Sequence, residues 1–237
     1  MLTTERTVRE LAIESPAATR VFERLQIDYC CGGSRTLEDA CRTAGVPLDS
    51  VLNALEAAAA VPVPALVRDW QTEPLAELVA HIRDAHHAYT RDALARITQL
   101  LDKVCSVHGA NHPELRGIQT TFGALRQELS MHMMKEEMML FPYIVRMEEA
   151  VLANEPVLPP PFGSVRNPVA MMMREHDGAG EDLREMRAAT NGYAAPADGC
   201  ITYQTLYRAL AEFEADLHQH IHLENNILFP RALNMEQ

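Results

Sequence analysis

One eleven-residue pattern occurs twice in this chain and constrains its fold more than any other feature. Residues 132–142 and 220–230 both read His-x3-Glu followed by Leu-Phe-Pro, and in each copy the His precedes the Pro by ten positions. Residues four apart lie on one face of an α-helix, so each His and its Glu can reach the same ion. The doubled pattern therefore predicts two metal-binding helices rather than exposed charged turns.

Two further histidines extend the repeat. His87 precedes His132 by 45 residues, His176 precedes His220 by 44, and each is followed by Leu seven residues later. The region is thus expected to form two similar helical hairpins. Four imidazoles and two carboxylates suit two iron ions with bridging Glu side chains better than one ion. No Cys lies in these motifs, which excludes a Cys-rich zinc site. The candidate ligands are His87, His132, Glu136, His176, His220 and Glu224.

The composition favours an all-α protein. Hydrophobic residues make up 47% of the chain, enough for a core, while 5% aromatic residues and 11 Gly fit helices better than sheets. The net charge of −12 argues against nucleic acid or an anionic membrane as a partner. The N-terminus has no apolar signal core and no run of about twenty apolar residues occurs, so we expect a cytoplasmic protein. Five Cys, two of them adjacent, do not resemble a secreted disulfide framework.

The chain is expected to contain two units joined by a linker. Residues 1–60 form a small helical unit, with helices predicted near 7–13, from 16 onward, 37–44 and 47–60. Residues 61–71, which begin Val-Pro-Val-Pro, form an extended linker. Residues 72–237 form a four-helix bundle of up-down-up-down topology, with helices near 72–107, 113–150, 168–191 and 197–233. Pro142 is expected to kink its helix or end a segment of it.

Cys30 and Cys31, followed by Gly32 and Gly33, are the second feature that suggests chemistry. On an exposed tip carried by a mobile arm, the two thiols could bind a metal transiently, exchange disulfides or react with oxidants. Adjacent cysteines do not easily chelate one ion together. The alternative is that two small residues pack beneath a turn. The isolated Cys41, Cys105 and Cys200 are expected to be buried and structural.

Several residues compete with these assignments. Helical periodicity favours His86 as the ligand of the first bundle helix, whereas the repeat favours His87, which we prefer. His218 and His222 are four apart but lack counterparts in the first copy, so we expect them to be solvated, or at most to contact a metal ligand without binding metal themselves. The many methionines in 131–139 and 171–173 suggest copper or adaptable packing around the site, and we expect packing.

The sequence also leaves two interpretations for the acidic residues that precede the candidate metal-binding histidines. Glu128 and Asp216 each lie four residues before a candidate His and could orient its imidazole. Ordinary surface charge is an equally good interpretation of both.

Taken together, these motifs resemble the repair-of-iron-centres family. The resemblance rests on Asp28-Tyr-Cys-Cys-Gly-Gly33, on the segment 132–137, and on 223–226 with Leu-Phe-Pro at 228–230, and it covers nearly the whole chain. It implies a small Cys-Cys domain, a hemerythrin-like bundle and two non-haem iron ions in an oxo- and carboxylate-bridged centre. It further implies that His87, His132, Glu136, His176, His220 and Glu224 are the ligands.

The resemblance implies repair of iron–sulfur clusters damaged by nitric oxide or peroxide. We rank iron donation first, reduction of nitric oxide second, and gas binding or sensing third. The expected partners are damaged iron–sulfur proteins or a cluster-assembly scaffold, nitric oxide or oxygen as a ligand, and a second copy in a homodimer. The sequence does not decide whether the protein is an enzyme.

Overall fold

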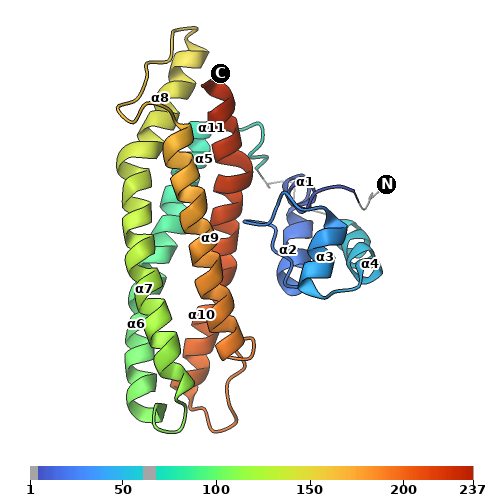
Figure 1. Cartoon of the computed structure of the whole chain (residues 1–237), viewed down its shortest axis with the longest axis vertical. Coiled ribbons are helices and arrows are strands. Elements are labelled where there is room, and N and C mark those ends of the chain that lie inside the picture. Colours follow the sequence, from blue (N-terminus) through green and yellow to red (C-terminus); the bar gives the residue numbers. More distant parts are fainter. Residues whose placement is uncertain (1–4, 61–67, 237) are drawn as a thin grey trace.

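The computed structural model describes residues 5–60 and 68–236, so positions 61–67 of the predicted linker 61–71 lie outside them. Within these ranges the regular structure is helical, apart from one isolated antiparallel bridge between Thr7 and Thr36. Four long rods run antiparallel, and a small helical unit lies beside them (Figure 1). The all-α, up-down-up-down bundle predicted from the sequence is confirmed.

Three of the four rods contain a π-helical turn. The first rod comprises α5 (Leu75–His81), the π segment η1 (Ile82–His87) and α6 (Ala88–His108). The second comprises α7 (Glu114–Lys135), η2 (Glu136–Leu140) and α8 (Phe141–Leu152), so the helix passes Pro142 by changing its winding. The third is α9 (Arg166–Ala189). The fourth comprises α10 (Ile201–Leu223), η3 (Glu224–Leu228) and α11 (Phe229–Met235). This rod begins four residues later than predicted, at 201 instead of 197.

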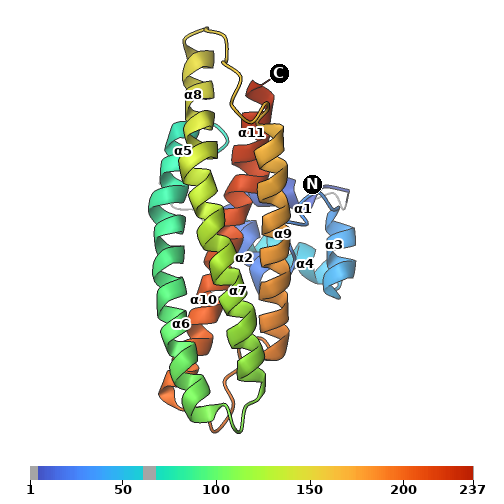
Figure 2. The ribbon, with the colours of Figure 1, turned by 60° about the vertical axis from the view of Figure 1, so that its left-hand side comes forward.

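The bundle core has two apolar clusters. The cluster toward the 108–113 turn includes Ile97, Phe122 and Phe213. The cluster toward the chain's C-terminal end includes Leu78 and Phe229. The rods are seen side by side in Figure 2. No helix in the described residues is long and apolar enough to span a membrane.

The small unit has its own core. Its helices are α1 (Val8–Glu14), α2 (Pro16–Arg24), α3 (Leu37–Ala44) and α4 (Leu48–Ala59). Thr7 and Glu10 cap α1 reciprocally, because each side chain accepts a backbone N–H of the other residue. The buried side chains at the centre of the unit include Val8, Phe22, Leu37 and Val51.

The loop between α2 and α3 reaches the bundle, and this corrects one expectation. Cys30 is only 5% exposed and packs with the apolar residues of the bundle, and Cys31 is partly buried against them. The thiols therefore do not lie on an exposed tip. Cys41 is buried as expected, Cys105 is partly buried, and Cys200 is exposed, contrary to expectation.

The expected packing role of the methionines is wrong for most of them. Met133 and Met172 are buried. The others in the two Met-rich stretches are 42–73% exposed, so they do not keep the interior dry: Met131, Met134, Met138, Met139, Met171 and Met173.

The core predicts a simple stability test. Phe213 is fully buried and its ring centroid lies 5.9 Å from that of Phe122. Phe213→Ala should lower the free energy of unfolding by about 3–5 kcal/mol, because it removes buried surface and leaves a cavity. Ile201→Ala, at a 74% exposed position of the same rod, should change it by less than about 0.5 kcal/mol. Denaturant unfolding followed by circular dichroism measures both.

Candidate metal centre

Six buried side chains from the four rods meet between the two apolar clusters. They form two overlapping groups in which the potential ligand atoms lie within 4.8 Å of one another. One group contains His87 and His220, the other His132 and His176, and both contain Glu136 and Glu224. The structure thus brings together every ligand candidate that the repeat predicted, and each group takes one imidazole from each hairpin.

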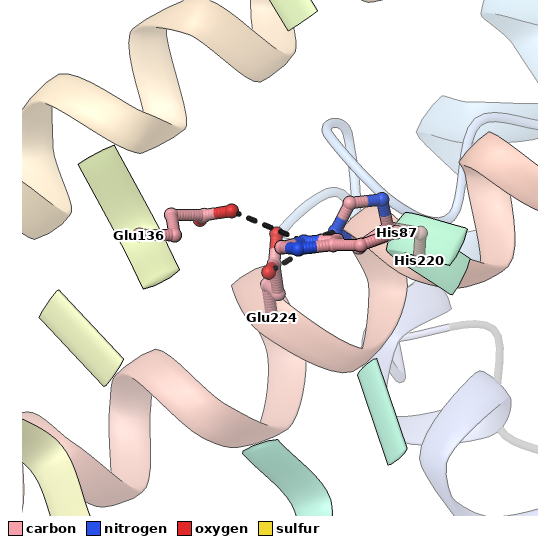
Figure 3. Close-up of side chains that lie close together, drawn as sticks. All are labelled: His87, Glu136, His220 and Glu224. Atoms are coloured by element: carbon pink, nitrogen blue, oxygen red, sulfur yellow. Dashed lines mark hydrogen bonds and ion pairs between the residues drawn. The ribbon is translucent and has the colours of Figure 1, made fainter. Parts of the chain in front are cut away.

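The two carboxylates lie between the imidazole pairs. Glu136 Oε2 is 3.4 Å from His87 Nε2 and 3.3 Å from His132 Nε2. Glu224 lies 3.1 Å from the Nε2 atoms of both His176 and His220. Part of this arrangement is drawn in Figure 3. Each carboxylate therefore contacts one imidazole from each group, as a bridging ligand would.

The potential ligand atoms of the six side chains face one another at the centre of the bundle. Among the described residues, all four oxygens of Glu136 and Glu224 are buried without a hydrogen-bond partner. His87 Nε2 lies 3.2 Å from His220 Nε2, and His132 Nε2 lies 3.0 Å from His176 Nε2. Buried carboxylates are costly unless paired or bound to a metal. Four imidazoles and two shared carboxylates fit two transition-metal ions, iron included.

The π-helical turns lie at the ligands. Glu136 begins η2, Glu224 begins η3 and His87 ends η1. The Phe141 N–H donates to the Glu136 carbonyl and the Phe229 N–H to that of Glu224, five residues back in each case. Such turns are frequent at functional sites. Helical periodicity does not predict these turns, although a Pro six residues after each Glu marks where α-helical bonding is interrupted.

The Phe of each Leu-Phe-Pro covers an imidazole of its own hairpin. Phe141 stacks on His87 with ring centroids 5.6 Å apart, and Phe229 stacks on His176 at 6.0 Å. Both phenylalanines are buried. These rings therefore place an apolar surface against two of the four imidazoles.

Three of the four imidazoles are oriented through Nδ1. His87 Nδ1 lies 2.7 Å from Glu137, His132 Nδ1 2.8 Å from Glu175, and His176 Nδ1 2.8 Å from Asn225. Such partners fix the ring and leave Nε2 for a metal. Glu137 and Asn225 are equivalent, since each follows the Glu of its own repeat.

The orienting roles considered for Glu128 and Asp216 are not found. Glu128 is exposed, and Asp216 lies 3.1 Å from Nδ1 of His86 instead of contacting His220. His86 itself stacks beside His220, with ring centroids 5.8 Å apart, and belongs to neither ligand group. The geometry therefore favours the repeat's choice of His87.

His222 is buried, contrary to expectation, and lies at the contact with the small unit. Its ring is 5.3 Å from that of Tyr29, and its Nδ1 lies 2.9 Å from the Asn226 amide nitrogen. Burial lowers the pKa of His222 to about 4, so the neutral ring accepts this bond. His218 is partly buried beside Glu214.

The electrostatics keep the carboxylates ionised. Burial would raise the pKa of Glu224, but His220 and His176 outweigh it and hold the pKa well below its usual value. Burial would also lower the pKa of His132, but Glu136 and Glu175 outweigh it and raise the pKa to about 10. Any bound cation must displace that proton, so metal binding should release protons.

The comparisons with known proteins agree with this geometry. The model of the hemerythrin HHE cation binding domain matches residues 78–232, which contain all six side chains. The chain belongs to the hemerythrin HHE family. A second model, described as a domain of unknown function, matches residues 4–59.

Full-length relatives share both parts. An iron-sulfur cluster repair protein YtfE of Pectobacterium atrosepticum is 39% identical over 98% of both chains. A protein of the same name from Edwardsiella ictaluri is 39% identical over 97% of both chains. Another, from Yersinia pseudotuberculosis, is 37% identical over 95% of this chain and 96% of the relative. The resemblance to the repair-of-iron-centres family is confirmed.

The neighbouring histidines offer a direct test of the ligand set. His87→Ala should remove at least one metal ion, since His87 Nε2 faces both Glu136 and His220. His86→Ala should retain the full metal content, because His86 is hydrogen-bonded to Asp216 instead. Metal analysis of both purified variants decides this, and greater loss from His86→Ala would show that the repeat gives the wrong residue.

The orienting carboxylates offer a second test. Glu175→Gln replaces the charged partner of His132 and should weaken metal binding about 10- to 100-fold. The matched control Glu128→Gln changes an exposed carboxylate one turn before His132 and should leave affinity unchanged. Competition with a chelator measures both affinities. Equal affinities for the two variants would contradict the orienting role of Glu175.

Proposed function

We propose that this chain repairs damaged iron–sulfur clusters by donating iron from a di-iron centre. The observation that carries the proposal is the sharing of Glu136 and Glu224 by two imidazole pairs. Full-length relatives named as iron-sulfur cluster repair proteins support the same conclusion. The clients are iron–sulfur proteins in the cytoplasm, where free thiols stay reduced.

The ligand set suits a donor of iron. The residues that would hold the two ions, with both Glu available to each of them, are His87, His132, Glu136, His176, His220 and Glu224. When bound, the ions supply exchangeable iron and redox chemistry. Carboxylate and imidazole ligands release ferrous iron more readily than an all-thiolate site does. The chain's own part is to hold the ions in a buried, Phe-lined space and to keep the ligands ionised.

Reduction of nitric oxide is the second candidate, and it requires a source of electrons. The Cys30 and Cys31 sulfurs lie 3.9 Å apart, and Cys31 Sγ is 3.6 Å from the carbonyl oxygen of His176. A dithiol this close to a metal-site residue favours keeping that candidate. Nitric oxide consumption by the iron-loaded chain, with and without both cysteines, distinguishes it from donation.

Iron transfer itself can be followed with an isotope. The chain loaded with ⁵⁷Fe should restore an iron–sulfur hydratase inactivated by nitric oxide, and the label should appear in the restored cluster. Glu136→Ala removes a carboxylate shared by both groups, so it should lose both ions and reduce recovery to that without added protein. Mössbauer spectra and hydratase activity are the measurements. Full recovery with unlabelled iron in the cluster would exclude donation.

A further inference from the structure

The turn that carries the cysteines is joined to the metal centre by hydrogen bonds. Asn225 Oδ1 lies 2.8 Å from His176 Nδ1, and the Asn225 amide donates to the Cys30 carbonyl at 3.3 Å. The Cys31 thiol lies 3.6 Å from the His176 carbonyl oxygen. His176 therefore faces the bundle centre with its ring and the cysteine turn with its backbone.

Three potential ligand atoms converge in this turn. Asp28, Cys30 and Cys31 each offer one atom within 4.8 Å of the other two. The two sulfurs are 3.9 Å apart, and Asp28 Oδ1 is 3.5 Å from Cys30 Sγ. A tetrahedral ion with bonds of about 2.3 Å to sulfur and 2.0 Å to oxygen predicts separations of about 3.8 and 3.5 Å. Two of the three separations therefore already match such an ion, and the third lies within 4.8 Å, even though the cysteines are adjacent.

The backbone holds these atoms in place. Asp28 Oδ1 accepts the N–H groups of Cys31 at 2.9 Å and Gly32 at 3.0 Å, which fixes the carboxylate beside the thiols. A Cβ at Gly33 would lie 2.9 Å from the Tyr29 carbonyl oxygen and 3.0 Å from Asn226 Oδ1. Only glycine allows the turn to approach η3 so closely.

The same three residues, Asp28, Cys30 and Cys31, line a cavity. Its volume is about 270 Å³, and Arg184 lines it as well. Arg184 lies 3.9 Å from Asp28 Oδ2, which is too far for a hydrogen bond. On the bundle side, Cys31 Sγ lies beside Gly180 of α9, where a Cβ would be in ordinary van der Waals contact with it at 3.8 Å.

We propose that Asp28, Cys30 and Cys31 form a third metal site, through which ferrous iron passes between the bundle and a client protein. The inference rests on the proposed function and specifies its route. Iron remains Fe²⁺ throughout, and each step exchanges ligands. Binding deprotonates both thiols, so two protons leave for each ion bound, and the cavity leaves a further position open to a client ligand.

Without an ion, the turn keeps Cys30 protonated. The neighbouring Cys31 thiol and then burial raise the pKa of Cys30 well above its usual value. A divalent ion reverses this, because a coordinating thiol is deprotonated.

Cobalt(II) is the probe for this site. The full chain, with iron already bound in the bundle, is titrated anaerobically with Co²⁺ while near-ultraviolet absorbance and proton release are recorded. We expect one equivalent to bind with a thiolate-to-cobalt charge-transfer band and two protons released. Failure to bind one equivalent of Co²⁺ in addition to the bundle iron, or binding without the band, would overturn the proposal.

Two substitutions and a control assign the site. Asp28→Asn keeps an oxygen for the Cys31 and Gly32 N–H groups, so the turn stays intact, yet Co²⁺ affinity should fall at least tenfold. Cys31→Ser removes one of the two thiolate ligands, so it should weaken the band at least about twofold. Cys41→Ser, at a buried cysteine outside the turn, should change neither. Unchanged Co²⁺ binding in Asp28→Asn and Cys31→Ser would contradict the assignment, and bundle iron content checks that both variants are folded.

The ⁵⁷Fe transfer assay distinguishes failure of the third metal site from failure of the proposed iron donation. If the unsubstituted chain fails to deliver ⁵⁷Fe, the proposed function is wrong, whatever the cobalt result. If it delivers ⁵⁷Fe and Asp28→Asn does so at the same rate, iron takes another route and the third site is wrong. Support requires delivery slowed at least tenfold in Asp28→Asn with bundle iron unchanged.

Discussion

The whole bundle depends on two buried carboxylates that are each shared by two imidazole pairs. Glu136 and Glu224 are fully buried, and their oxygens lack hydrogen-bond partners among the described residues. Such groups are tolerable only with compensating positive charge. Because each hairpin supplies one carboxylate and one imidazole to each group, neither hairpin can complete a metal site alone. The ions would therefore join the two halves of the bundle as well as serve its chemistry.

The two copies of the repeat build the same local structure around their buried carboxylates, Glu136 and Glu224. The Glu begins a π turn, and the next residue orients an imidazole of the same hairpin. The Phe covers that imidazole and is the first residue of the following α-helix. The copies differ one position further on. Met138 is 73% exposed, whereas its counterpart Asn226 is buried under the small unit and its amide donates to the Tyr29 carbonyl. The small unit therefore covers only the second copy.

Helical periodicity and the repeat were sufficient to predict the bundle and its candidate metal ligands from the sequence. The rods, their order and the six converging side chains follow from the doubled pattern, and the choice of His87 over His86 needed the repeat rather than the apolar stripe. The sequence was insufficient for contacts between distant segments. The burial of His222, the partner of His132 and the exposure of the methionines depend on which face each neighbouring element covers, and helical spacing does not record that.

The consecutive residues Glu224, Asn225 and Asn226 connect the bundle to the cysteine turn. Glu224 faces the ligand groups, Asn225 joins His176 to the Cys30 carbonyl, and Asn226 holds the Tyr29 carbonyl. They belong to one short π turn, so a change in winding there moves all three side chains together. An ion that binds Glu224 and a turn that binds the two amides consequently act on the same element. Binding free energy at either place can thus bias the other, and the coupling must be equal in both directions.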